Sequence, residues 1–374
     1  MKTYNLMVCF VLAFSFVSCD KSSSASSEIE ETGIPVNYTV FLSKNNQLSA
    51  LELSALNGEL TVNGELSTFA NIPSTYKKFR TSNDISFYYT SNCKGYIQWY
   101  NVISNEAMLL EMFNDIEPCA IQITSIAHTD KYVMISYEMD LPGKDSQKVV
   151  RIYSKNETSE PYIELILDKK PIDLISSANR LFVLTLNEFV TDEFHLSVFD
   201  LSTNEELIEL DLGVNAKKLF KNGLEQIIIS YPEFHTIIDP VSLDKTYTTY
   251  GENSEPNFTT TKDSFLDITG KMYFQKAILD AEIDMVPAIY DFQTNNTVVY
   301  LFENFLSESE INVKYNIGST SAIAHDDNNK YMLIGYQKKN QAGKGGVLRV
   351  STAPELKIID NINLDGVPQT IFVK

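Results

Sequence analysis

Acidic and aromatic side chains alternate in several polar segments that separate apolar, strand-like runs. Carboxylates can hydrogen-bond sugar hydroxyls or coordinate Ca²⁺, and an exposed ring can stack on the face of a sugar. These segments therefore predict a surface that binds a protein partner or a glycan; the alternative is that they are solvated loop charges of an acidic chain. The candidate residues are Glu138, Asp140, Asp145, Glu188, Phe189, Asp192, Glu193, Asp280, Glu282, Asp284 and Met285.

Three of these carboxylates, Asp280, Glu282 and Asp284, occupy every second position. An EF-hand loop also needs a central glycine and a bidentate glutamate at its last position, and this segment has neither. We therefore predict no cofactor and no metal site, while Ca²⁺ is the cation that such oxygen ligands would select.

Residues that could support catalysis are sparse. The chain has four scattered histidines without a second histidine or cysteine at ligand spacing, and it contains no P-loop, GxGxxG, GxSxG or HExxH motif. A catalytic group could still be assembled from several strands around a central channel. The candidates on the predicted innermost strands are Lys77, Lys78, Asp173, Lys217, Lys218 and Asp267.

A repeated unit that positions these residues extends over most of the chain. Each copy has an apolar run, a polar gap, a second run, a tight turn and a third run, and the clearest copies are 180–212, 271–302 and 330–364. A period in the forties predicts units that cannot bury their apolar faces alone and must stack. Alternation within runs such as 195–200 favours half-buried strands.

The spacing of the units predicts seven four-stranded blades of an all-β propeller. The second strands begin 45 to 59 residues apart, at Tyr38, Ile85, Tyr132, Leu181, Gln226, Met272 and Tyr331. The last segment, 367–374, reads as a first strand without a second, and 37–42 reads as a second strand without a first. We therefore predict that the C-terminal strand joins the N-terminal blade and closes the ring.

Antiparallel strands within each blade sort the connections onto two faces. Turns between second and third strands share a face with the links between blades, and all long excursions fall on that face: 138–148, 187–194, 279–286, 303–311 and 337–346. Long loops in a compact domain are often functional, so this face is the predicted binding surface.

The repeat resembles bacterial seven-bladed propellers of the YVTN type, in which a polar turn leads into a Tyr-Val strand and then an Asp-x-x-Thr hairpin. The matching segments are 128–133, 325–331, 199–203 and 290–294. Asp200, Asp239 and Asp291 occupy equivalent hairpin positions, where we expect their carboxylates to accept hydrogen bonds from nearby backbone N–H groups.

The N-terminus resembles a bacterial lipoprotein signal. Lys2 precedes an uncharged apolar run that ends in Phe16-Val17-Ser18-Cys19, and the run is too short to span a bilayer. The resemblance implies a signal peptide over 1–18, a lipidated Cys19 with a flexible tether over 19–35, and a propeller domain over 36–374. The expected location is the bacterial cell envelope, with the outer membrane favoured and with lipid as the only membrane attachment.

Two cysteines then remain, Cys93 and Cys119. The sidedness rule places them on one face and close in space, and two thiols in an oxidising compartment can pair, so we predict a disulfide with two free thiols as the alternative.

A formal net charge of −19 excludes nucleic acid as a partner, because an acidic surface repels phosphate backbones. The sequence therefore predicts a monomeric, non-catalytic binding or scaffold propeller. The alternative is a lactonase-like hydrolase or a lyase with a divalent metal in its channel.

Overall fold

The structure is a computed structural model that describes residues 34–374 except 57, 144, 156–160, 253, 259–260, 262, 280 and 353–354. The predicted signal peptide, Cys19 and most of the tether lie outside the described residues. Residues 34–374 form one compact unit. Among the described residues, no helix is long and apolar enough to cross a membrane.

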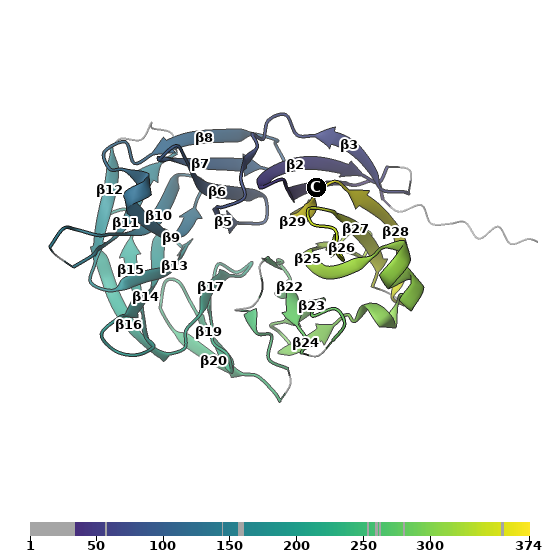
Figure 1. The fold of residues 1–374 in the computed structure, drawn as a ribbon. Coiled ribbons are helices and arrows are strands. Elements are labelled where there is room, and N and C mark those ends of the chain that lie inside the picture. Colours follow the sequence, from purple (N-terminus) through teal and green to yellow (C-terminus); the bar gives the residue numbers. More distant parts are fainter. Residues whose placement is uncertain are drawn as a thin grey trace, which may run out of the picture. The chain divides into compact units, whose positions relative to one another are not determined.

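Seven antiparallel sheets follow one another around a ring (Figure 1), which confirms the predicted seven-bladed β-propeller. Blade 1 contains β29 (Val367–Val373), β1 (Asn37–Lys44), β2 (Gln47–Ser54) and β3 (Thr61–Glu65). Blade 2 contains β5 (Lys77–Arg80), β6 (Asp84–Ser91), β7 (Lys94–Asn101) and β8 (Ala107–Met112). Blade 3 contains β9 (Ile121–His128), β10 (Tyr132–Met139), β11 (Gln147–Ser154) and β12 (Tyr162–Leu167).

The remaining blades repeat the pattern. Blade 4 contains β13 (Lys170–Ser177), β14 (Arg180–Asn187), β15 (Glu193–Asp200) and β16 (Glu206–Val214). Blade 5 contains β17 (Lys218–Lys221), β18 (Ile227–Ser230), β19 (Phe234–Ile238) and β20 (Lys245–Thr249). Blade 6 contains β21 (Ser264–Leu266), β22 (Lys271–Ala277), β23 (Met285–Asp291) and β24 (Asn296–Val299). Blade 7 contains β25 (Ile317–Asp326), β26 (Tyr331–Lys338), β27 (Gly345–Ser351) and β28 (Lys357–Leu364).

The first strand of each blade lies innermost. Strand β9 contacts both β5 and β13, β13 contacts β17, and β25 contacts β21 and β29. The apolar faces of the blades pack against each other, so that each core cluster is shared between neighbouring sheets. This arrangement explains why the repeat cannot fold as an isolated unit.

The links between blades carry the few additional elements. Strand β4 (Ile72–Pro73) pairs with β2, and η1 (Pro118–Ala120) precedes β9. The turns η3 (Phe302–Asn304) and η4 (Glu310–Lys314) lie between β24 and β25. This long link accounts for the widest interval between the predicted units.

Tight turns follow the predicted chemistry. The carboxylate of Asp200 accepts hydrogen bonds from the backbone N–H groups of Ser202 (2.7 Å) and Thr203 (3.2 Å). Asp239 and Asp291 make the same pair of bonds in their own hairpins. The prediction that these aspartates shape turns is therefore confirmed, and their lone pairs are used locally.

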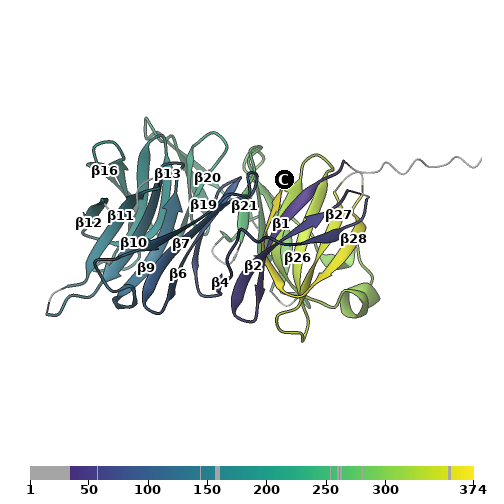
Figure 2. The same ribbon diagram turned by 90° about the horizontal axis from the view of Figure 1, so that it is seen from above.

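The C-terminal strand closes the ring as predicted. Strand β29 pairs with β1 from Tyr38 opposite Val373 to Ser43 opposite Val367, and Figure 2 shows purple β1 and β2 beside the yellow strands. Phe372 is 1% exposed and packs edge-on against Phe41 at a centroid distance of 6.0 Å. Side chains from the N-terminal strand β1 and the C-terminal strand β29 therefore pack in one hydrophobic cluster.

A second set of contacts joins blade 7 to blade 1. The phenol of Tyr38 donates a 2.9 Å hydrogen bond to buried Asp326, and the Arg349 guanidinium donates to Asp360 and to the Gly58 carbonyl. The Tyr38–Asp326 bond is buried and the two Arg349 bonds are partly buried, so polar groups at this junction are paired as they are inside a protein.

Truncating Phe372 tests the closure. We expect Phe372→Ala to lower the free energy of unfolding by about 3–5 kcal/mol, because a fully buried aromatic side chain is lost from the junction. The control is Gln369→Ala on the same strand. The Gln369 side chain is partly exposed, and among the described residues its amide donates one hydrogen bond, to the Val367 carbonyl. Urea unfolding followed by circular dichroism measures both variants; equal stability of F372A and the wild type would contradict the closure.

His235 offers a pH test of the core. Its ring lies among Tyr250, Tyr290 and Phe292, and neither ring nitrogen has a partner among the described residues. Burial lowers the pKa of His235 from 6.5 to about 4. His235 therefore binds a proton at a higher pH in the unfolded chain than in the folded protein. The free energy of unfolding is highest above about pH 6.5 and decreases as the pH falls towards 4.

We expect His235→Phe to flatten this dependence. Relative to the wild type, H235F should gain up to about 3 kcal/mol between pH 7 and pH 4, because phenylalanine needs no proton and no partner. Urea unfolding at several pH values measures the difference. His195→Gln is the control, since that ring lies beside Glu193 and Glu209 outside the aromatic cluster, and identical pH profiles for H235F and wild type would refute the account.

Candidate functional site

The two faces of the ring carry different connections, as predicted. We call the face with the links between blades and the turns from second to third strands the long-loop face. It holds the turns 140–146, 188–192, 278–284 and 339–344 and the links 250–263 and 300–316. The opposite face, the short-turn face, holds turns such as 81–83, 129–131 and 178–179.

Two predicted carboxylates on the long-loop face join blades 3 and 4. Lys170 lies 2.6 Å from a carboxylate oxygen of Glu138, and Lys148 lies 2.6 Å from Glu188. The hydrogen bond from Lys148 lowers the pKa of the Glu188 carboxyl, and the bond to Glu138 raises the pKa of Lys170. These two acids therefore hold neighbouring blades together.

Other predicted acids also have partners nearby. Ser146 donates a 2.6 Å hydrogen bond to Asp140, Asn187 donates a 2.6 Å bond to Glu193, and Glu282 pairs with Lys339 at 3.1 Å. The exposed residues Asp145, Asp192 and Asp284 have no side-chain hydrogen bond or ion pair within the described part of the chain. Met285 is the first residue of β23. Asp280 lies outside the described residues.

Large apolar side chains project from the same face. Phe189 is 89% exposed at the tip of the 188–192 turn, and Leu279 is 91% exposed at the start of the 278–284 turn. Val313 in η4 is 77% exposed. A partner that covered these side chains would remove their apolar surface from water.

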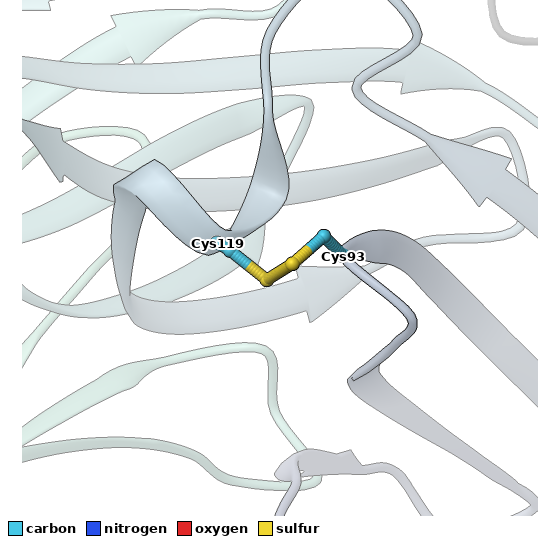
Figure 3. The surroundings of a disulfide bond; sticks show 2 residues. All are labelled: Cys93 and Cys119. Carbon is cyan, nitrogen blue, oxygen red and sulfur yellow. A yellow bond between two sulfur atoms is a disulfide. The ribbon is translucent and has the colours of Figure 1, made fainter.

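Cys93 and Cys119 form a disulfide on the long-loop face (Figure 3). Cys93 lies with Asn92 in the tight hairpin between β6 and β7, where both residues have positive φ, and Cys119 lies in η1. The Cα atoms are 5.1 Å apart, within the range that a disulfide spans. The bond ties a hairpin of blade 2 to the link that leads into blade 3.

The central channel contains two hollows that meet at a narrow polar layer. The larger, about 460 Å³, extends to the short-turn face, and the smaller, about 250 Å³, extends to the long-loop face. Both are lined by Lys78, Ser125, Ile126, Asp173 and Lys218. These five residues come from the innermost strands of four different blades.

An ion pair crosses the channel beside this layer. The Lys78 ammonium lies 2.5 Å from Asp263 and donates a 2.9 Å hydrogen bond to Thr370. Arg80 stacks on Phe372 at 4.1 Å from the ring centroid, and burial lowers the pKa of its guanidinium to about 10. Blades 1, 2 and 6 therefore meet at a charged and aromatic contact on the axis.

Asp173 and Lys218 complete the layer. The Asp173 carboxylate accepts hydrogen bonds from the Ser125 hydroxyl (2.9 Å) and from the backbone N–H groups of Leu174 and Leu219 (3.0 Å each). Burial raises the pKa of Asp173 and lowers the pKa of Lys218. The ammonium of Lys218 has no hydrogen bond or ion pair among the residues that the structure describes, and it lies 5.3 Å from the Phe220 ring centroid.

The sequence identified part of this channel. Lys77, Lys78, Asp173, Lys217 and Lys218 line the hollows, as does Asp267, although Asp267 lies in the turn after β21 and its carboxylate accepts bonds from Thr269 and Lys271. Arg80, Asp263 and Thr370 were missed. The last strand of the chain contributes Thr370, so only ring closure brings it to the axis.

The channel carboxylates lie in cationic surroundings. Within the described part of the chain, no three histidine, cysteine or acidic residues gather as ligands. The channel carboxylates Asp173 and Asp263 stand beside the cationic side chains Lys78, Arg80 and Lys218. Positive charges at these positions would repel a divalent ion.

No protein-family model and no curated protein matches this chain. Solved structures share its fold at low sequence identity. The periplasmic gluconolactonase PpgL of Pseudomonas aeruginosa aligns with a TM-score of 0.55 at 9% identity over 91% of this chain and 99% of that one. A candidate 6-phosphogluconolactonase of Bacteroides fragilis aligns with a TM-score of 0.51 at 12% identity over 91% and 98%. These similarities establish the propeller fold.

Removing the disulfide should lower stability. We expect C93S/C119S to lose about 3 kcal/mol of unfolding free energy, because the bond closes a loop of 26 residues in the unfolded chain. Urea unfolding measures the loss. The single variants C93S and C119S and the reduced wild-type protein serve as controls and should show the same decrease. Free thiols at both positions in non-reduced peptide maps would contradict the prediction.

Proposed function

We propose that this protein is a non-catalytic binding propeller of the bacterial cell envelope, tethered through lipidated Cys19, that captures a protein partner or a glycan on its long-loop face. The observation that carries the proposal is the exposure of Phe189 and Leu279 in two turns on this one face. A rigid ring presents both tips at fixed positions, which lowers the entropic cost of binding.

The acidic loop residues have a narrower role in this proposal. Glu138 and Glu188 are occupied by lysines between blades 3 and 4, so they shape the surface. Asp145, Asp192 and Asp284 are exposed and available to hydrogen-bond a ligand. Apolar tips surrounded by carboxylates fit a partner that combines an apolar patch with donor groups, as protein surfaces and glycans do.

A lactonase-like hydrolase is the second candidate. It is favoured by the names of two fold neighbours, a gluconolactonase and a candidate 6-phosphogluconolactonase, and by an open channel with ionisable groups. A metal-dependent hydrolase is less favoured, because cationic side chains surround the carboxylates of Asp173 and Asp263 and would repel a metal ion.

Truncation of the two tips tests the binding proposal. We expect F189A/L279A to weaken capture of an envelope-extract partner or of a glycan from a defined panel by about 30-fold, because exposed anchors contribute about 2 kcal/mol when covered. Both side chains are exposed, so folding should be unchanged. The matched control is L224A/I268A, which removes two side chains of similar exposure, 78% and 80%, from the short-turn face.

The outcome separates the two candidates. Equal capture by F189A/L279A and by the control would contradict the binding proposal. Hydrolysis of glucono-1,5-lactone by the purified protein, with loss of the activity in Asp173→Asn, would instead establish the hydrolase. Retained ligand capture by D173N without any lactone turnover supports the binding proposal.

A further inference from the structure

The long-loop end of the channel concentrates positive charge on an acidic protein. The hollow of about 250 Å³ is lined by Lys77, Lys78, Lys217 and Lys218, and its one acidic lining residue is Asp173. The whole chain has a formal net charge of −19. The four lysines come in two consecutive pairs, one at the start of β5 and one at the start of β17. The hollow is therefore positively charged, although the molecule as a whole is negatively charged.

Most of this charge is not neutralised by the protein. Lys78 is paired with Asp263 across the channel. Lys77, Lys217 and Lys218 have no ion pair among the described residues, and the ammonium of Lys217 lies 5.7 Å from the Phe194 ring centroid. Asp173 already accepts three hydrogen bonds from Ser125 and two backbone N–H groups.

Lys218 is the least compensated of these groups. Burial and the neighbouring Lys78 ammonium lower its pKa, while Asp173 and Asp263 act in the opposite direction. Lys218 is half-buried at the start of β17. An anion placed beside its ammonium would offset the electrostatic cost of this partial desolvation. An anion here would also be shared with Lys217 and Lys77 at the mouth of the hollow.

We propose that this hollow is a binding site for a small anion bearing a carboxylate or phosphate group, held by Lys77, Lys217 and Lys218. A volume of about 250 Å³ lies just below the range of about 300–1,000 Å³ that is usual for drug-sized ligands, so the ligand is compact. It enters from the long-loop face. The site is separate from the loop tips and does not depend on a partner bound there.

Calorimetric titration of the purified protein tests the site. The probes are inorganic phosphate, citrate and D-glucuronate, with D-glucose as the neutral control, at low ionic strength. The wild type should bind at least one anion and not glucose, and binding should weaken as sodium chloride is added, because salt screens the lysines. Comparing the affinity for phosphate with the affinities for citrate and D-glucuronate shows whether the site prefers a phosphate or a carboxylate group.

Single substitutions locate the binding. Lys218→Met and Lys217→Met should each weaken anion binding by about tenfold or more, because each removes an uncompensated charge from the hollow. Lys357→Met is the matched control: it removes one lysine from the outer strand β28 and should leave affinity unchanged. Lys77→Met, at an exposed position, should also weaken binding and keeps the test valid if K218M fails to fold.

Three results would overturn the proposal. They are no heat from any of the anions with the wild type, unchanged affinity in K217M and K77M, and an equal loss in K357M, which would indicate a general charge effect. If F189A/L279A does not weaken partner capture, the anion-binding result still stands, because none of the four lysines lies at a loop tip.

Discussion

Pairing between β29 and β1 is the contact on which the rest of this molecule depends. No blade can bury both of its faces alone, and a ring buries them all only if the first and last sheets also meet. Strand β1 pairs with β29 from Tyr38 to Ser43, and Phe372 is buried at this junction. Tyr38 also donates a hydrogen bond to Asp326 on the neighbouring blade. Because the last residues of the chain complete the first sheet, the ring also leaves no open edge between its ends.

Closure has a direct consequence for function, because it sorts every connection onto one of two faces and creates a central channel. The long loops share one face. On this face the disulfide of Cys93 and Cys119 ties a hairpin of blade 2 to the link into blade 3, and two ion pairs join blades 3 and 4. Under the proposed function, such a platform presents Phe189 and Leu279 to a partner without the entropic cost of ordering flexible segments.

The channel and the loop face place opposite charges close together. The loops are rich in carboxylates, whereas the adjoining end of the channel is lined by lysines, among them the uncompensated Lys218. Such a boundary can select ligands by charge. Within the channel, the Asp173 carboxylate accepts three hydrogen bonds, from the Ser125 hydroxyl and two backbone N–H groups.

The periodicity of the sequence alone determined the architecture. Strand starts such as Tyr38 and Tyr331, the aspartate turn at Asp200 and the identity of the closing strand could all be predicted, because alternation, turn chemistry and repeat length are local properties. What only the tertiary structure decided is which charges are free. Glu138 and Lys218 look equally available in the sequence. In the structure the first is neutralised by a lysine from the next blade, whereas the ammonium of the second has no ion pair among the described residues. Partners that come from different blades depend on how the blades are arranged around the axis, and no local pattern records that arrangement.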